Sequence, residues 1–446
     1  MIRLAIADIR QQTAMWLWTV LCATVGAACS AGSVIAMFTA LGAAQHAGDA
    51  NMVEAAIALG GNIVFFTVLA SVGVVASTVG LTLTSQRREH ALWLVLGVPR
   101  RRVRSVLNTE LAVLGLVAGV LALPLSLLVA ALALLQWTNS ALDLHGASIA
   151  FQPWHLGAAV AAGVFPCFVG GWGAAQRTSK TPEMRAFREN ADPTARPGVG
   201  RSILAFCLLA GVVGMWIPGL GLELSGGLEQ RTAFAFAGNL FLVCLLLLMG
   251  PWVLTPLMML WTAAVPANDV AWRLAVQSCR TRATRSVTTV LPFALALSMV
   301  GLFMVIGNAM PGGTAGIGDV LVVLGWVFVV SWVGGLAVIA LVGRERRRDS
   351  ALLSVAGARP GVIARSTLCE GLIYAITAIL FSLITLLVAC WTIAIGGRVS
   401  PLDMVSGLPW PTLTGLAAIT LATPCAALLW PAIAASRTNV SSALRS

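Results

Sequence analysis

Long apolar stretches alternate with short charged segments along the whole chain. A helix needs about 20 consecutive apolar residues to cross the hydrocarbon core of a bilayer. We expect a spanning helix in each of ten stretches, at 14–42, 58–84, 107–135, 152–174, 203–219, 234–262, 286–307, 320–342, 367–395 and 411–434. The pattern predicts an all-α polytopic membrane protein.

Composition supports the same class. Of 446 residues, 58% are hydrophobic and 10% are charged, whereas a typical soluble domain has about 25% charged residues. This excludes an ordinary soluble domain. Helices are expected because a helix satisfies its own backbone hydrogen bonds where water is absent.

Positive charge is divided unequally between the two sides of the predicted spans. Of 28 Lys and Arg residues, all but Arg231 and Arg398 fall on one side. The positive-inside rule puts the arginine-rich side in the cytoplasm, and an even number of spans puts both termini there. We therefore predict a multi-pass protein of the cell membrane. Topology and contact with anionic lipid account for the basic isoelectric point, so nucleic acid is not an expected partner.

An internal repeat organises the sequence. A shift of 260 residues aligns 87–110 with 347–370 without a gap, and it also brings 175–185 onto 435–445. The identical pairs in the first block are Arg87/Arg347, Arg88/Arg348, Ala91/Ala351, Leu92/Leu352, Val95/Val355, Gly97/Gly357 and Glu110/Glu370. One shift that serves two distant blocks favours duplication over chance.

The repeat predicts a 4 + 2 + 4 arrangement of helices. The expected parts are a first four-helix unit at 1–190, a linker with a central helix pair at 191–267, and a second unit at 268–446. Upstream of the first block the shift becomes 270, which assigns ten extra residues to an outer loop at 43–57. Both copies start and end on the same side. They are therefore parallel repeats, and we expect an amphipathic lead-in before each one.

The two basic segments are the strongest candidates for a functional site. Glycine suits a helix C-cap and proline suits the start of the following helix, at Gly97 and Pro99 in the first copy and at Gly357 and Pro360 in the second. Two short helices joined by a tight turn would offer a docking element to a cytoplasmic partner. The alternative is an ordinary basic loop. The repetition of Gly and Glu favours docking, because topology requires only Arg and Lys.

Glu110 and Glu370 lie where the third helix of each copy is expected to enter the membrane. A carboxylate there could interact with the N-terminal helix dipole or with a nearby arginine such as Arg104 or Arg365. A gating or coupling role stays open beside this structural one. The predicted spans hold no ionisable group near their centres, which disfavours a proton-driven or ion-driven carrier.

Signatures of catalysis and of metal binding are lacking. The sequence has no HExxH, GxSxG or phosphate-binding GxxxxGK[ST] motif. Its four histidines are dispersed, and its nine cysteines show no metal-ligand spacing. We therefore expect no enzyme activity, no metal and no cofactor on this chain. Gly115 and Gly119 form a GxxxG pair, which we interpret as helix packing.

The pattern Arg-Arg-Glu-x-Ala-Leu-x-x-x-Leu-Gly at 87–97, followed by Glu110, resembles the cytoplasmic signature of FtsX-like permeases. These are the membrane subunits of MacB-type (type VII) ABC transporters. The 4 + 2 + 4 plan is similar to the ten-helix BceB-type branch. The sequence departs from that branch because the loop between spans seven and eight is only 308–319, too short for a large extracellular domain. It also has Lys180 and Val440 where the family's terminal motif has proline.

The resemblance implies an ATP-driven machine whose ATPase is a separate chain. It implies two copies of that ATPase, which carry the ATP and Mg²⁺. It implies docking of the ATPase on Arg87, Arg88, Glu89, Gly97, Glu110, Arg347, Arg348, Asp349, Gly357 and Glu370. The expected function is export or extraction of a hydrophobic, amphiphilic or peptide substrate by mechanotransmission. The alternative is a mechanotransmitting regulator of an extracellular or sensor partner.

Overall fold

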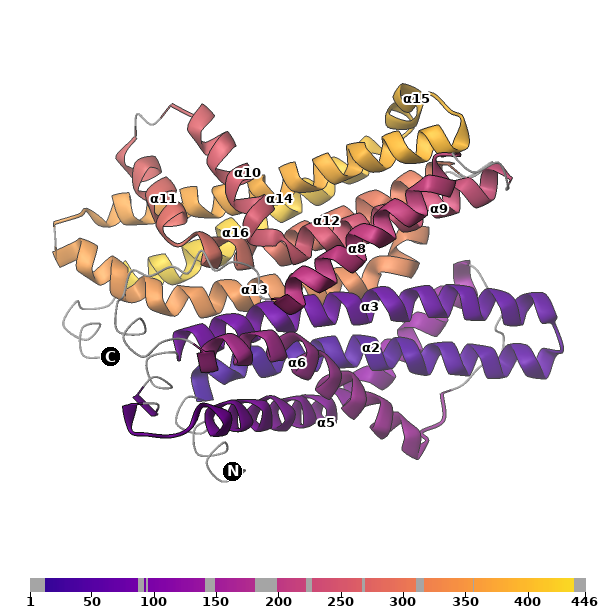
Figure 1. Cartoon of the computed structure of the whole chain (residues 1–446), viewed down its shortest axis with the longest axis horizontal. Helices are drawn as coiled ribbons and strands as arrows, with labels where there is room; N and C mark the ends of the chain where they lie inside the picture. Colours follow the sequence, from indigo (N-terminus) through magenta and orange to yellow (C-terminus); the bar gives the residue numbers. More distant parts are fainter. Residues whose placement is uncertain are drawn as a thin grey trace. The chain divides into compact units, whose positions relative to one another are not determined.

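The computed structural model describes residues 13–86, 92–93, 95–140, 149–180, 199–221, 227–266, 269–309, 317–355 and 357–436. Thirteen α-helices and no strand occur within these ranges (Figure 1). Ten of the helices are long and apolar enough to cross a membrane, and each corresponds to one predicted span. The predicted all-α polytopic fold is confirmed.

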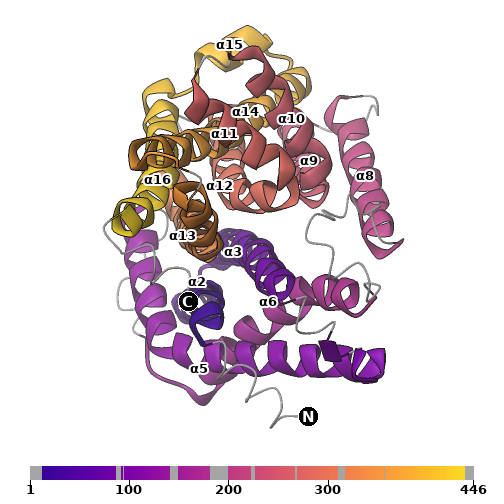
Figure 2. The ribbon, with the colours of Figure 1, turned by 90° about the vertical axis from the view of Figure 1, so that its left-hand side faces the viewer.

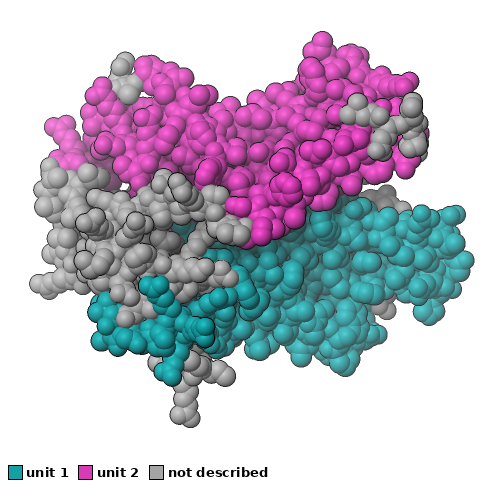
Figure 3. Space-filling model, in the orientation of Figure 1, with its two compact units in different colours: residues 1–191, 321–341 teal, residues 192–320, 342–446 magenta. Residues whose placement is uncertain are grey.

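The chain divides into two compact units (Figure 3). Unit 1 comprises residues 1–191 and 321–341, and unit 2 comprises residues 192–320 and 342–446. The central helices therefore belong to the same compact unit as most of the second copy. The predicted boundaries near 190 and 267 follow the sequence repeat and stay a prediction.

Unit 1 begins with a long helical hairpin. Helices α2 (Thr13–Ala47) and α3 (Ala50–Ser85) lie side by side in Figures 1 and 2. Only Gly48, at φ +70°, and Asp49 interrupt them. The Asp49 carboxylate accepts hydrogen bonds from the amides of Asn51 at 2.9 Å and Met52 at 3.4 Å, which caps α3. The expected outer loop at 43–57 was wrong, because this alanine-rich segment extends both helices.

The other two helices of the first copy cross at three glycines. Helices α5 (Arg100–Ser140) and α6 (Pro153–Lys180) approach backbone to backbone. A methyl group added to Gly119 would lie 2.6 Å from Val160 Cα, and one added to Gly163 would lie 2.8 Å from Gly119 N. Gly115 and Gly119 therefore serve packing, as predicted.

The middle of α13 (Ile317–Val355) belongs to unit 1, although its sequence belongs to the second copy. The Cys22 thiol lies 3.9 Å from the carbonyl oxygen of Val333, and Gly334 packs directly on Val74. The repeat shift relates Val74 to Gly334, so equivalent positions of the two copies meet at this contact.

Unit 2 contains the central helices and most of the second copy. Its helices are α8 (Val199–Gly219), α9 (Leu228–Leu248), α10 (Gly250–Ala264), α11 (Val270–Thr281), α12 (Ala283–Ala309), α14 (Pro360–Gly397), α15 (Pro401–Ser406) and α16 (Trp410–Ser436). The prediction of one continuous helix at 234–262 was wrong, because two helices occupy this stretch. The backbone breaks at Met249, since Pro251 starts a new helix there.

The central pair packs on the second copy through polar and small side chains. Helix α8 packs on α9, which in turn packs on α14. The Asn239 amide of α9 donates a hydrogen bond of 2.6 Å to the Thr392 hydroxyl of α14, and both side chains are buried. A buried amide in a spanning helix needs such a partner, because lipid offers none.

One further feature of unit 2 matches the sequence prediction. Helix α11 buries Ala271, Ala275 and Cys279 at four-residue spacing, so the expected amphipathic lead-in of the second copy is present. Asp269 caps this helix by accepting from the Ala271 amide at 3.2 Å. The corresponding lead-in of the first copy lies outside the described residues.

Candidate functional site

The turn before α5 is a glycine-capped helix end. The Val98 amide donates to the Trp93 carbonyl at 3.1 Å, and Gly97 between them has φ +86°. This bond and the left-handed glycine are the marks of a Schellman C-cap, a conformation that L side chains rarely adopt. The Arg102 amide then donates to the Pro99 carbonyl at 2.8 Å, and α5 begins.

The second copy repeats this turn before α14. Gly357 has φ +89°, and Pro360 occupies the first turn of α14 behind the N-cap residue Arg359. In this copy α13 runs without a break to Val355, so the helix before the turn is the end of a spanning helix. The predicted glycine turn is present, but the prediction of two short helices was wrong here, because the turn joins two long helices of 39 and 38 residues.

Apolar side chains are exposed around the first turn. Leu92 is 46% exposed, Val95 is 59% exposed and Leu96 is 81% exposed. No atom lies within 4 Å of a methyl group added to Gly97, so the turn itself is open. A rigid backbone turn that carries exposed apolar side chains suits contact with another protein.

Glu110 and Glu370 lie inside their units. Their exposed fractions are 0% and 8%. Helices α5 and α14 each begin ten residues earlier, whereas the dipole effect fades within the first turn. The expected stabilisation by the helix N-terminus was therefore wrong, because both helices start earlier than the hydropathy pattern indicated.

The remaining predicted docking residues have no described side chains. Arg87, Arg88 and Glu89 lie outside the described residues. The segment Arg347, Arg348 and Asp349 is helical, as part of α13, and its side chains lie outside the description.

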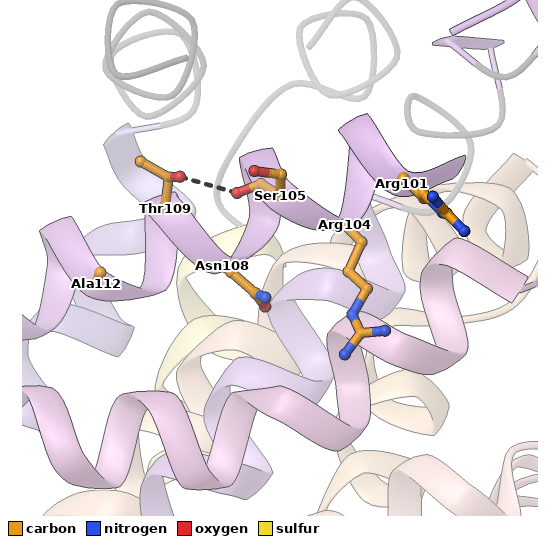
Figure 4. Close-up of a pocket in the computed structure, with 6 residues that line it drawn as sticks. All are labelled: Arg101, Arg104, Ser105, Asn108, Thr109 and Ala112. Carbon is orange, nitrogen blue, oxygen red and sulfur yellow. Dashed lines mark hydrogen bonds between the residues drawn. The ribbon is translucent and has the colours of Figure 1, made fainter. Parts of the chain in front are cut away.

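A hollow on α5, which the sequence patterns did not predict, lies near its basic end (Figure 4). It is open, has a volume of about 570 Å³, and is lined by Arg101, Arg104, Ser105, Asn108, Thr109 and Ala112. The Thr109 hydroxyl donates to the Ser105 carbonyl at 2.8 Å. The polar residues recur at helical spacing, which could have revealed them as one face.

The described part of the chain contains no group of three or more His, Cys, Asp or Glu residues that could hold a metal ion. All nine cysteines are free thiols, and most are buried in the helices.

Residues 62–182 match the protein family described as FtsX-like permease C-terminal. This range runs from α3 to the segment after α6 and includes the Gly97 turn and Glu110. The match supports an FtsX-family permease, and such permeases are typically membrane components without enzyme activity. The search of curated proteins found no match to this chain.

Proposed function

We propose that this chain is the membrane subunit of an ABC transporter whose ATPase is a separate polypeptide. The FtsX-like match in residues 62–182 and the ten spanning helices support this function. The observation that carries it is the pair of glycine turns. Gly97 and Gly357 are related by the sequence repeat, and both have the same left-handed backbone conformation at the start of a long helix.

Each turn would dock one ATPase, so that one chain engages two. The exposed Leu92, Val95 and Leu96 supply an apolar contact surface in the first copy. The arginines at 87–88 and 347–348, with Glu89 and Asp349, would supply the charged part of the contact. Glu110 and Glu370 would act from within the units, by fixing the helices that follow the turns. ATP and Mg²⁺ would be bound by the partner.

Movement at a turn would reach the far side of the membrane through one continuous helix. Helix α5 has 41 residues, which corresponds to roughly 60 Å at 1.5 Å per residue. The hydrocarbon core is about 30 Å thick. A displacement of its basic end by ATPase closure would therefore also move α6, which is locked to α5 at the glycine crossing.

The cargo of such a machine would be a hydrophobic, amphiphilic or peptide molecule extracted from the membrane. The short connection between α12 and α13 leaves no room for a large capture domain, which separates this chain from typical members of the ten-helix BceB-type branch. A substrate would then be recognised by the spanning helices themselves.

Docking can be tested by co-purification of the full chain with a co-expressed ABC ATPase. Valine at Gly97 and Gly357 is expected to abolish the complex, because a β-branched residue at positive φ costs about 1–3 kcal/mol at each turn. Gly97→Asn should restore much of it, since Asn tolerates this conformation. Gly157→Val is the control, at an exposed helical position with no atom within 4 Å of an added methyl group.

Unchanged complex formation in the Gly97→Val, Gly357→Val double variant would contradict the docking assignment. Transport is tested separately, by ATP-dependent movement of an amphiphilic dye in vesicles that contain the complex. ATPase activity that responds to an extracellular protein partner but never moves cargo would support the regulator function in its place.

A further inference from the structure

The hollow on α5 is positively charged and rich in hydrogen-bond donors. Arg101, Arg104, Ser105 and Asn108 line it, and no acidic residue occurs among the lining residues that the structure describes. In Figure 4 these side chains follow one another along the first turns of the helix, with Arg104 and Asn108 extending from the same side. Guanidinium, hydroxyl and amide groups together form a suitable surface for a phosphate.

An aromatic pair on α6 holds one of the two arginines. The Arg104 guanidinium lies 5.2 Å from the ring centre of Trp172, within cation–π distance. Trp172 packs edge to face on Phe168 at 5.1 Å, and the two rings are 39% and 38% exposed. Tryptophan is enriched where lipid headgroups meet the hydrocarbon core. This contact favours a position of the hollow at the level of the headgroups.

An apolar surface continues from the hollow toward the membrane centre. Leu116 and Val120 follow Ala112 at four-residue steps on α5, and they are 52% and 47% exposed. On α6, Phe165 is 53% exposed and Val169 is 47% exposed. A ligand that fits both regions has an anionic head and long apolar chains.

The second copy does not repeat the hollow. The shift of 260 residues replaces its lining residues with Gly361, Ala364, Arg365, Leu368, Cys369 and Leu372. Neither arginine is retained, since Arg365 stands at the position of Ser105, and the hydroxyl and amide groups are absent. Positive-inside topology would not require Ser and Asn in the first copy. A surface for two identical ATPases would recur in both copies, as the glycine turns do. The hollow thus suits a single ligand.

We propose that this hollow binds the headgroup phosphate of an anionic phospholipid from the leaflet at the basic end of α5. Arg101 and Arg104 donate charged hydrogen bonds to the phosphate, and Ser105 and Asn108 add neutral ones. The acyl chains lie along the exposed apolar faces of α5 and α6. The site makes the first unit dependent on anionic lipid in a way that the second unit is not.

The test measures lipid retention by native mass spectrometry on the full chain, purified in micelles that contain phosphatidylcholine and phosphatidylglycerol. The wild-type chain is expected to retain one phosphatidylglycerol in preference to phosphatidylcholine. The Arg101→Gln, Arg104→Gln double variant should bind it about 30-fold more weakly, which corresponds to about 1 kcal/mol for each cation at the membrane surface.

The matched control is the Arg359→Gln, Arg365→Gln double variant, which loses the same charge from exposed positions at the start of α14. It should keep the lipid. Equal loss in both double variants would show non-specific attraction and overturn the proposal. Displacement of the lipid by millimolar inorganic phosphate would mean a free-phosphate site and would also overturn it. Full lipid retention in the Arg101→Gln, Arg104→Gln variant would also overturn the proposal. If that variant also lost ATPase co-purification, the hollow would be a protein contact.

Discussion

A single methyl group at the crossing of α5 and α6 is expected to destabilise the first unit. In Gly163→Ala the new Cβ atom would lie 2.8 Å from Gly119 N and 2.9 Å from Gly119 Cα. The preferred separation of such atoms is about 3.5–4.0 Å, so the helices must separate by roughly 1 Å. A radial gap of this size loses a quarter to a half of the dispersion energy of the contacts it opens.

The magnitude follows from two opposing terms. Overpacking of this kind costs about 1–3 kcal/mol. Replacing glycine by alanine inside a helix recovers about 1 kcal/mol through helix propensity. Gly157→Ala lies on the same helix, in open space, and has only the favourable term. The difference between the two variants therefore isolates the cost of separating the helices, and we expect about 1–3 kcal/mol.

The assay is reversible unfolding of the purified chain in mixed micelles, with the SDS fraction as the denaturing variable. Gly163→Ala should unfold at a lower SDS fraction than Gly157→Ala, and Gly163→Leu at a lower fraction still. Equal stability of the two alanine variants would refute the reasoning, since it would mean that α5 and α6 can separate without cost.

Three further predictions concern two other helix contacts and the membrane topology. A double-mutant cycle with Asn239→Leu and Thr392→Val should give a coupling energy of about 0.6–1.7 kcal/mol in micelle unfolding, between the average and the maximum for hydrogen bonds between spanning helices. Additive effects of the two substitutions would show that this hydrogen bond does not help to attach the central helices. Gly334→Ala should lower the stability in micelle unfolding, because the added methyl group would meet Val74. Gly325→Ala meets open space and should not lower it, so equal unfolding curves would contradict the prediction. Cysteines introduced at 308–319 should be labelled by impermeant maleimide from outside intact cells, and labelling only after permeabilisation would reverse the topology.

Much of the fold could be predicted from the sequence, because lipid imposes a strong and local rule. Each spanning helix must be long and apolar, so hydropathy alone located all ten. The two glycine turns were also predictable. A left-handed C-cap is determined by a few adjacent residues, and the repeat identified Gly97 and Gly357 as a related pair.

Helix ends were less predictable, because hydropathy marks the apolar stretch that crosses the membrane, whereas the helix can extend beyond that stretch. Alanine-rich sequence carries α2 and α3 through the segment expected to be a loop. The early start of α5 at Arg100 places Glu110 in its third turn. The break at Met249 depends on Pro251, and proline in a spanning segment is compatible with either a bend or a break.

Only the tertiary structure decided which helices pack together and which surfaces remain open. The sequence contains many small residues, and nothing local distinguishes Gly163, which touches another backbone, from Gly157, which touches nothing. The contact that holds Arg104 at the hollow likewise needs α6, since Trp172 lies far from Arg104 in the sequence and meets it only through space. The sequence by itself determined the spanning helices, their repeat and the two turns, because these depend on neighbouring residues. Packing depends on distant residues that meet only in the folded chain.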